Sequence, residues 1–559
     1  MTRLVFGSLF FTVMVAGVVT HSAAWSAPPA ATGLPAPTGL PALRRQGAAT
    51  QLLVDGKPFL ILGGELGNST ASSPESLGAV WPRLADLHAN TVLAPVYWEL
   101  IEPAEGTYDF ASVTRVIEQA RQRKLRVVLL WFGSWKNGMS SYAPAWVKRD
   151  TRRFPRAEVA GGRAIEELSA FGAETAAVDA RAFAALMTHL RTIDGTGARA
   201  RHTVLMVQVE NEVAMIDEAA DRSAVAQRAY AAPVPAELVS YLQAHRATLA
   251  GPLAQAWKAA GERATGTWAE LFGAGIATEE IFMAWHLARY VDTVARAGRA
   301  VYPLPLFVNA ALNRPGARPG QYPSGGPLPH LYDVWRAGAP TIDFLSPDIY
   351  YGNFADWTGR YARPDNPLFV PEAKNDLTCA ANAFYAIGAH QALGFSPFAI
   401  ESLDGPVAAS LTASYRVLEQ LAPLVLEHQG RGTMTAVLLD KDAPTQEVKL
   451  GDHRVSFRHD YTWEWSGPGR LAPTWPRAAA VIISTGSREY IVAGSGVIAT
   501  FAPEPPIAGV SGIERIEEGS FQNGKWIAGR RLNGDESHQG RHLRLPAGEF
   551  GIQRIWLYR

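Results

Sequence analysis

The chain has 559 residues, and its 52 Lys and Arg are balanced by 52 Asp and Glu, so the formal net charge is zero. A nucleic-acid-binding protein or a protein held electrostatically on anionic lipid carries a basic excess, so the charge balance argues against both classes. The hydrophobic fraction of 47% and the charged fraction of 19% are those of a globular protein and exclude a mainly disordered chain. A single cysteine, Cys379, excludes an internal disulfide and a zinc site built from several cysteines.

Residues 1–24 have the organisation of a secretory signal peptide. Arg3 precedes an apolar run over residues 4–19, and the small residues 22–24 follow it. The run is shorter than the about 20 apolar residues that a membrane span needs. Residues 25–46 are rich in Ala and Pro and are typical of a flexible leader. We therefore expect an exported protein, periplasmic or extracellular, without a stable membrane anchor.

Residues 47–430 alternate short apolar runs with segments of helical periodicity, which is the pattern of successive βα units. The eight runs are Phe59–Gly63, Thr91–Val96, Arg126–Phe132, Thr203–Val209, Leu306–Asn309, Ile342–Ser346, Leu368–Val370 and Phe395–Ile400. Eight strands with intervening helices predict an α/β fold, the (β/α)8 or TIM barrel. A doubly wound open sheet is the competing fold, but its glycine fingerprint and a phosphate-binding loop are missing.

Two further segments complete the predicted domain organisation. Residues 213–275 form an insertion that is long for a barrel loop, and we expect it to lie over the mouth of the barrel. Residues 431–559 contain short runs rich in β-branched and aromatic residues, broken by Gly, Pro and Asp. The runs lie at 433–439, 447–450, 454–459, 480–484, 489–492, 497–501 and 551–558. They predict a C-terminal all-β sandwich domain.

Six of the eight predicted strands are followed by a carboxylate, at the end of the barrel where active sites lie. The carboxylates are Glu65, Glu99, Glu212, Asp348, Glu372 and Glu401. The same strand ends also supply Trp98, Trp131, Trp135, Lys136, Asn137 and Tyr350. Carboxylates accept hydrogen bonds from sugar hydroxyls, and aromatic faces cover the apolar face of a pyranose. We therefore expect a carbohydrate site, with the three tryptophans as sugar platforms. Glu401 is interpreted as a solvated loop carboxylate.

Hydrolysis of a glycosidic bond requires two carboxyl groups on opposite sides of that bond. Glu210 and Glu212 lie two residues apart at one strand end, so the alternation of side chains along a strand does not choose between them. Glu372 directly follows a proline at the end of the seventh strand. These positions supply the candidates for a catalytic pair.

Several segments resemble glycoside hydrolase family 35, a β-galactosidase family. VQVENEV at 207–213 resembles the family's QxENEYG, residues 90–110 resemble its NTV…WNxHEPxxGxxDF, and APAW at 143–146 resembles its LPAW. The resemblance covers about residues 50–430, and the C-terminal sandwich resembles one attached to a bacterial branch of the family. It implies a retaining β-galactosidase in which Glu212 is the general acid/base, Asn211 binds the sugar 2-hydroxyl and Glu372 is the nucleophile.

The resemblance also implies the substrate, a carbohydrate with terminal β-D-galactose such as a galactosylated plant hemicellulose, for example xyloglucan. The sequence departs from the family pattern where Glu99 replaces Asn, where Ile101 replaces His, and where Trp131–Asn137 replaces the segment that binds galactose. Other β-glycosidases of the clan, a β-glucosidase or a mannanase, are therefore alternatives. We expect Tyr350 to hydrogen-bond the nucleophile, and we expect the two catalytic carboxyls about 5–5.5 Å apart.

Other chemistries find no support in the sequence. The 13 histidines form no His-x-His and no His-Glu-x-x-His motif, and no Gly-x-Ser-x-Gly is present. We therefore expect no metal, no cofactor and no serine nucleophile. A non-catalytic carbohydrate-binding protein is the alternative from another class, but such a protein needs neither Glu212 nor Glu372.

Overall fold

The computed structural model describes residues 39–195, 200–506, 508 and 510–559. The expected signal peptide and most of the expected leader lie outside these residues. The end of that leader, Ala42–Gln46, is not flexible but forms strand β1, which pairs antiparallel with β2 (Ala49–Val54), and β2 pairs with β3 (Lys57–Phe59). The ladder satisfies the backbone groups of β1, which explains its order. No helix in the part of the chain that the structure describes is long and apolar enough to cross a membrane.

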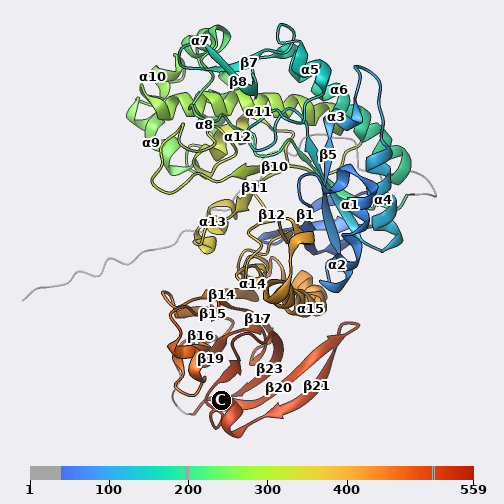
Figure 1. The fold of residues 1–559 in the computed structure, drawn as a ribbon. Helices are drawn as coiled ribbons and strands as arrows, with labels where there is room; N and C mark the ends of the chain where they lie inside the picture. The colour runs from blue at the N-terminus through green and yellow to red at the C-terminus, as the bar shows by residue number, and fades with distance from the viewer. Residues whose placement is uncertain (1–38, 196–199, 507, 509) are drawn as a thin grey trace, which may run out of the picture. The chain divides into compact units, whose positions relative to one another are not determined.

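Eight parallel strands close into a barrel (Figure 1). They are β4 (Ile61–Glu65), β5 (Thr91–Tyr97), β6 (Arg126–Phe132), β9 (Val204–Val209), β10 (Leu306–Ala311), β11 (Phe344–Ile349), β12 (Val370–Ala373) and β13 (Gly394–Pro397). Nearly every strand residue is buried, as is typical of a parallel sheet packed on both faces. The predicted TIM barrel is thus confirmed, with each strand within a few residues of its predicted position.

Helices cover the outside of the barrel. The longer ones are α4 (Ala111–Gln122), α6 (Ala173–Leu190), α11 (Ile276–Val301), α12 (Tyr332–Gly338), α13 (Phe354–Tyr361), α14 (Cys379–Ala389) and α15 (Gly405–His428). Short helices α1 (Pro74–Gly78), α2 (Trp81–Asp86), α3 (Trp98–Ile101) and α5 (Ala145–Arg149) lie in the connections. Helices α6 and α11 pack closely at Gly298, where a Cβ would lie 2.3 Å from the Phe183 ring.

The insertion at 213–275 contains α7 (Ala224–Ala231), α8 (Ala236–Ala244), α9 (Gly251–Ala259) and α10 (Trp268–Phe272). Its helices pack against α11 and α12. Trp268 stands edge-on to Phe282 of α11, and Asp333 of α12 accepts a hydrogen bond from the backbone N–H of Ala250. The insertion therefore extends the outer layer of helices.

The C-terminal region is all-β, as predicted. One sheet has six strands in the order β14-β17-β18-β23-β20-β21, and the other has four in the order β15-β16-β19-β22. Their bounds are β14 (Met434–Leu439), β15 (Thr445–Leu450), β16 (His453–His459), β17 (Ala478–Gly486), β18 (Glu489–Ser495), β19 (Val497–Pro503), β20 (Gly512–Gln522), β21 (Lys525–Leu532), β22 (Leu543–Leu545) and β23 (Gly551–Tyr558). The core that they enclose includes Val437, Phe457, Ile482, Val492 and Ile555.

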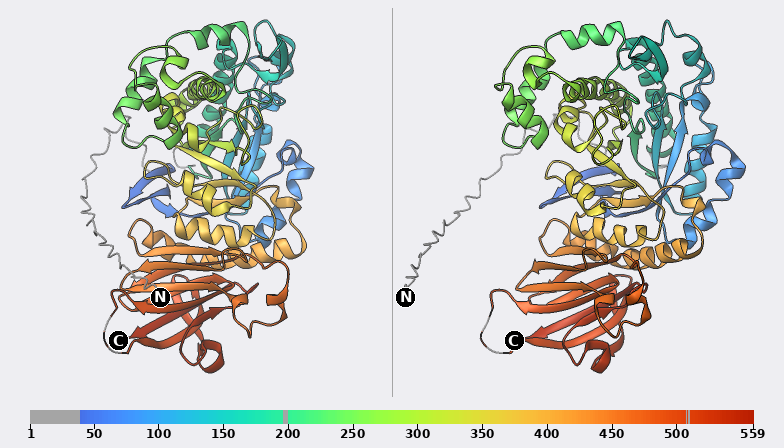
Figure 2. Two further views of the ribbon diagram at one scale, coloured as in Figure 1. Left: turned by 90° about the vertical axis from the view of Figure 1, so that its left-hand side faces the viewer. Right: turned by 60° about the vertical axis from the view of Figure 1, so that its left-hand side comes forward.

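Helices α14 and α15 lie between the barrel strands and the six-stranded sheet (Figure 2). Gly388 of α14 approaches β14 and β17 so closely that a Cβ would lie 2.6 Å from both the Cβ of Ala436 and a Cγ of Val481. Beside this contact, the guanidinium of Arg477 donates a hydrogen bond of 2.9 Å to the carbonyl of Gly352, in the connection after β11. The apolar residues on the two sides form one continuous core.

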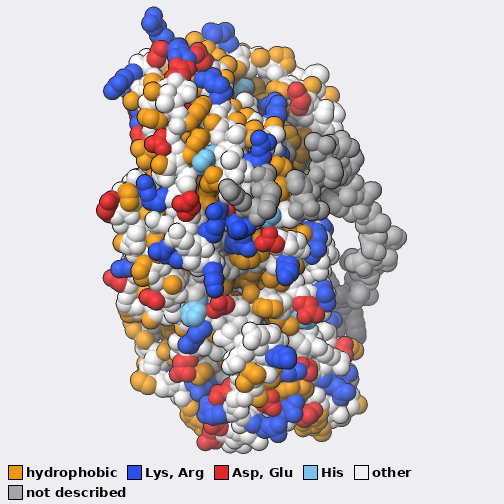
Figure 3. Space-filling view, turned by 90° about the vertical axis from the view of Figure 1, so that its right-hand side faces the viewer, with side chains coloured by type: hydrophobic (Ala, Val, Ile, Leu, Met, Phe, Trp, Pro, Cys, Tyr) orange, Lys and Arg blue, Asp and Glu red, His pale blue; other side chains and the backbone are white. Residues whose placement is uncertain are grey.

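Charged side chains are mixed on the surface. On the face shown in Figure 3, Lys and Arg side chains are interspersed with Asp and Glu side chains. This distribution agrees with the zero net charge of the sequence.

Candidate active site

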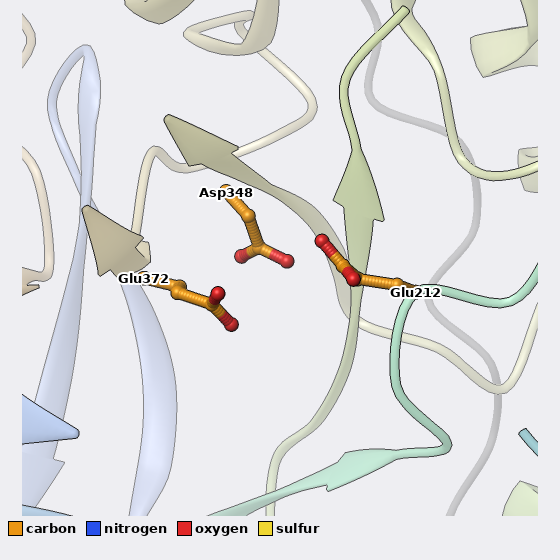
Figure 4. Close-up of side chains that lie close together, drawn as sticks. All are labelled: Glu212, Asp348 and Glu372. Carbon is orange, nitrogen blue, oxygen red and sulfur yellow. The ribbon is translucent and has the colours of Figure 1, made fainter. Parts of the chain in front are cut away.

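Three carboxylates converge at the carboxyl ends of barrel strands (Figure 4). Glu212 follows β9, Asp348 lies near the end of β11, and Glu372 lies in β12. One carboxylate oxygen of each lies within 4.8 Å of those of the other two. A close pair of this kind is typical of retaining glycosidases, because an inverting enzyme needs about 6.5–9.5 Å to admit a water molecule.

The structure distinguishes Glu210 from Glu212. Glu210 is fully buried, and its carboxylate accepts a hydrogen bond of 2.8 Å from the backbone N–H of Trp135. Glu212 instead lines the cavity together with Glu372. Both glutamates have left-handed backbone conformations, with φ of 61° and 48°, so the strand's alternation of side chains ends before them. This is why the two do not share a face.

Asn309 holds Glu212 and Asp348 in place from the end of β10. Its side-chain oxygen accepts a hydrogen bond of 2.9 Å from the backbone N–H of Glu212, and its nitrogen donates one of 2.6 Å to Asp348. The sequence pattern assigned no role to Asn309, and it placed Asp348 only among the six strand-end carboxylates. The signal for Asp348 was its place at a strand end, and Asn309 lies at the end of the fifth predicted strand, where no acid was found.

Burial and mutual repulsion set the protonation of the carboxyl groups. Burial and the negative charge of Glu372 raise the pKa of Glu212 to about 7, against the opposing effects of Lys136 and of a hydrogen bond with Asp348. Burial, followed by the charge of Glu372, also holds the pKa of Asp348 and of Glu65 well above the usual range. At neutral pH a fraction of Glu212 therefore carries the proton that a general acid needs.

Lys136 supplies the positive charge of this site. Burial alone would lower its pKa, but the carboxylates of Glu372, Glu212 and Glu65 outweigh burial and raise the pKa. Its side chain lies over the ring of Phe132, with the ammonium nitrogen 5.1 Å from the ring centre. The ammonium group is thus kept charged among the acids.

Glu372 is held by one oxygen and left free at the other. The hydroxyl of Tyr350 donates a hydrogen bond to its Oε1, as expected from the sequence, whereas Oε2 is buried and has no hydrogen-bond partner among the described residues. The side-chain amide of Asn211 is also buried without a hydrogen-bond partner among those residues. A buried polar group without a hydrogen bond lowers the stability of the folded protein, unless a bound ligand supplies the missing hydrogen-bond partner.

The carboxylates open into a cavity of about 360 Å³. It is lined by Asn68, Lys136, Asn137, Glu212, Ala311, Leu312, Pro323, Asp348, Tyr350, Tyr351, Glu372 and Phe398. Its lining contains no residue of the 213–275 insertion, although we expected that segment to lie over the mouth of the barrel. The helices of the insertion pack against α11 and α12 instead. The cavity wall is formed by the strand ends and by shorter loops.

The three tryptophans expected as sugar platforms do not line this cavity. Trp98 and Trp131 are fully buried, and their indole N–H groups donate to Glu102 and Asp179. Trp135 is also buried and stands edge-on to Tyr290. Their ring faces are covered by protein, so they belong to the core. The aromatic side chains at the cavity are instead Tyr350, Tyr351 and Phe398.

Three acidic residues of the predicted ring lie elsewhere. Glu99 does not line the cavity; its side chain is 41% exposed, and its carboxylate lies 3.6 Å from the ammonium of Lys148. Glu65 is fully buried and does not line the cavity, and its burial together with the charge of Glu372 holds its pKa well above the usual range. Glu401 is not a freely solvated loop carboxylate, because its Oε1 accepts hydrogen bonds from the backbone N–H of Gly67 and from the Thr70 hydroxyl. It therefore anchors the loop after β4.

Glu212, Asp348 and Glu372 are also the one group of acids among the described residues arranged closely enough to hold a metal ion. Oxygen ligands of this type suit Ca²⁺ or Mg²⁺. Their negative charge is already countered by Lys136, and Asn309 and Tyr350 hydrogen-bond two of them. The arrangement thus has the features of a catalytic carboxylate pair with a supporting third acid.

The family model of glycoside hydrolase family 42, described as β-galactosidase, matches residues 82–260. The assignment to family 35 is therefore wrong, whereas the prediction of a β-galactosidase-type glycoside hydrolase agrees with the match. The matched segment contains Asn211 and Glu212 and ends before Glu372. A second model, a domain of unknown function called DUF5597, matches residues 411–544. A comparison with curated proteins finds no match.

The solved structures to which this chain is similar include glycosidases. The β-galactosidase from Bacillus circulans sp. alkalophilus is 13% identical, with 66% of this chain and 57% of that chain covered and a TM-score of 0.46. The β-galactosidase from Rahnella sp. R3 is 15% identical, with 66% and 57% covered and a TM-score of 0.45. The catalytic domain of β-amylase from Paenibacillus polymyxa is 12% identical, with 63% and 96% covered and a TM-score of 0.40. The chain thus spans 57% of the length of these two β-galactosidases.

Proposed function

We propose that the protein is a retaining glycoside hydrolase that removes terminal β-D-galactosyl residues from an oligosaccharide or polysaccharide. The observation that carries this proposal is the placement of carboxylate oxygens of Glu212 and Glu372 within 4.8 Å at the carboxyl end of the barrel. The match of residues 82–260 to a β-galactosidase family supports the choice of sugar.

In the first step, Oε2 of Glu372 attacks the anomeric carbon while Tyr350 holds Oε1. The bond between the anomeric carbon and the leaving oxygen breaks, and that oxygen takes the proton of Glu212. In the second step, Glu212 accepts a proton from water, and the resulting hydroxide oxygen displaces Glu372 from the sugar. The anomeric configuration is inverted twice and therefore retained.

The same electrostatics explains how Glu212 changes roles between the steps. Before the reaction, the negative charge of Glu372 helps to raise the pKa of Glu212, which favours the protonated acid. The glycosyl ester on Glu372 carries no charge, so this contribution disappears in the intermediate. The pKa of Glu212 then falls, and the ionised carboxylate can act as the base.

Sugar binding is assigned to the polar groups without partners and to the aromatic faces at the cavity. The amide of Asn211 is free to hydrogen-bond a sugar hydroxyl, and Lys136 and Asn137 line the cavity wall. Tyr351 and Phe398 offer apolar surface to the sugar ring. A volume of about 360 Å³ is at the small end of ligand sites, which suits a terminal sugar unit.

We further propose that the natural substrate is a galactosylated plant hemicellulose, of which xyloglucan is a neutral example, and that the protein acts in the periplasm or outside the cell. The match of residues 82–260 to a β-galactosidase family supports the terminal galactose of this substrate, and the proposed location rests on residues 1–24.

The test is the release of nitrophenol from nitrophenyl β-D-galactoside, beside the matched β-glucoside, β-mannoside and α-L-arabinoside. We expect a preference for the β-galactoside that is lost in Glu212→Gln and in Glu372→Gln. Glu118→Gln, which changes an exposed carboxyl of α4, is the matched control and should keep full activity. If the protein preferred another glycoside, the proposed sugar would be wrong and the preferred sugar would take the place of galactose. No turnover of any of the four, with sugar binding intact, would indicate a carbohydrate-binding protein.

The stereochemical course gives a separate test. Proton NMR of the reaction mixture should show β-galactose as the first product, before mutarotation. If α-galactose appeared first, the enzyme would be inverting and the double displacement would be wrong.

A further inference from the structure

A second and larger cavity, of about 570 Å³, lies beside the carboxylate site. Its walls come from helix α5, from the hairpin of β7 (Arg156–Val159) and β8 (Arg163–Leu168), and from the segment around Ile216 that follows Glu212. The proposed mechanism leaves this cavity unused. Its volume is within the range of sites that bind small molecules.

One tight turn separates the two cavities. The backbones of Lys136 and Met139 exchange two hydrogen bonds, of 2.8 and 3.0 Å. Lys136 lines the carboxylate cavity, and Met139 lines the second cavity. The ends of a β-turn lie within about 7 Å of each other. A ligand in the second cavity would therefore lie against the same turn that lines the carboxylate cavity.

Arg156 is a buried cation with an incomplete set of partners. Its side chain is 10% exposed, yet its Nη1 has no hydrogen-bond partner among the described residues. The nearest acid is Glu166, with 3.9 Å between Nη1 and a carboxylate oxygen, which is too long for a hydrogen bond. Glu166 is itself half exposed and so counters the buried charge weakly. A buried guanidinium with a free N–H calls for an anionic partner.

The other lining groups indicate what kind of anion fits. Arg163 also lines the cavity, and it makes no ion pair with any residue in the described ranges. Burial raises the pKa of Glu167 to about 9, so at neutral pH this residue is a neutral carboxylic acid that can donate a hydrogen bond. Glu166 and Asp217 are acceptors on the same wall. Donors and acceptors beside a modest positive charge suit a hydroxylated ligand with a single negative charge.

We propose that this cavity is an aglycone subsite for a uronic acid, whose carboxylate is bound by Arg156. The inference rests on the proposed function and narrows its substrate to galactosylated saccharides that carry a carboxylate on the sugar next to the terminal galactose.

The test compares two disaccharides that differ only at C6 of the reducing unit, β-galactosyl-glucuronate and β-galactosyl-glucose. At pH 7 and low salt, we expect the wild type to show a kcat/KM at least 10-fold higher for the acidic disaccharide. Arg156→Gln should reduce that ratio about 10-fold or more, since a hydrogen bond to a charged group is lost. Raising the ionic strength should also reduce the ratio. Equal kcat/KM for the two substrates in the wild type would overturn the proposal.

Two further variants guard against a folding artefact. Arg163→Gln changes an exposed cavity residue and should lower the ratio without altering the melting temperature. Arg152→Gln removes an exposed arginine outside the cavity lining and should leave the ratio unchanged. A fall of the ratio in Arg152→Gln equal to that in Arg156→Gln would indicate a general charge effect and contradict the assignment.

Direct binding separates failure of the subsite from failure of the proposed function. If the protein turns over no β-galactoside, the proposed function fails, and calorimetric titration with free glucuronate then decides the subsite. Binding of glucuronate but not glucose by the wild type, lost in Arg156→Gln, would support the uronate site. Absence of glucuronate binding in the wild type would overturn it.

Discussion

At the scale of single residues, two features position Glu212, its left-handed backbone and the Asn309 side chain. The φ of 48° turns the carboxylate into the cavity, and the hydrogen bond from its backbone N–H to Asn309 stabilises that conformation. Residues other than glycine adopt this region of φ and ψ only where their surroundings compensate the strain. The backbone conformation therefore contributes as much to the position of the Glu212 carboxylate as the side-chain conformation does.

The activity should depend on the proton of Glu212. Its pKa of about 7 means that the acid form is lost as the pH rises through that value. We expect kcat/KM for nitrophenyl β-galactoside to fall on the alkaline side of about pH 7, as measured in a pH–rate profile. A profile that stayed flat to pH 9 would contradict the assignment of Glu212 as the acid.

Tyr350 should act through Glu372. Tyr350→Phe removes the hydroxyl that holds the nucleophile, and a hydrogen bond to a charged group is worth about 1.5–3 kcal/mol. We expect kcat/KM to fall roughly 10- to 100-fold with little change in stability. Tyr351→Phe is the matched control, because its hydroxyl lies 3.4 Å from the Leu312 carbonyl, at the far limit of a hydrogen bond, and it should lose little activity.

At the scale of elements, the barrel strands were predictable because each one is buried on both faces and appears in the sequence as a continuous apolar run. Strands β20 and β21 gave no such signal. They pair into a ribbon that is mostly half-buried in β20 and mostly exposed in β21, and it is rich in charged residues, with Glu517, Glu518, Arg530 and Arg531 among them. Their pairing is specified by backbone hydrogen bonds and by cross-strand ion pairs, which a search for apolar runs does not detect.

The candidate site could be predicted only in part for a related reason. The strand ends identified the carboxyl end of the barrel and gave both Glu212 and Glu372. They could not separate core tryptophans from cavity aromatics, because a strand end supplies both. Trp131 is buried since its indole N–H is satisfied by Asp179 of α6, a contact that depends on the folded helix layer.

Strand β6 offers a test of that reassignment. Trp131→Phe leaves Asp179 without one donor and leaves space beside Phe183, so we expect the free energy of unfolding to fall by about 1–3 kcal/mol. The KM for nitrophenyl galactoside should stay within about twofold of the wild type. Trp465→Phe, at a side chain that is 62% exposed, is the control and should change stability by less than about 0.5 kcal/mol. A large rise in KM in Trp131→Phe would instead indicate that Trp131 binds the sugar.

At the scale of the whole molecule, barrel and sandwich share one apolar core across α14. The contact is tight at Gly388, where the helix and strands β14 and β17 leave no room for a methyl group. Separating the two parts would therefore expose apolar residues of each.

Gly388→Ala should therefore destabilise the protein although alanine favours helices. The added methyl would overlap Ala436 and Val481, and overpacking of a core costs about 1–3 kcal/mol. Chemical denaturation should show a lower midpoint. Gly359→Ala in α13, where the nearest atom to the added methyl is 4.0 Å away, should instead be neutral or stabilising by up to about 1 kcal/mol. If both substitutions shifted the midpoint equally, the close contact would not be the cause.

The closed ring of barrel strands also bears on how this protein avoids aggregation. A ring has no edge, so none of its strands offers free backbone groups to another molecule. Open edges remain in the C-terminal sheets, where β21 forms one border of the six-stranded sheet. That border carries the charged side chains of Lys525, Arg530 and Arg531, and such side chains on an edge strand disfavour its pairing with another sheet. The barrel therefore offers no strand edge to another molecule, and the exposed border at β21 is guarded by charge.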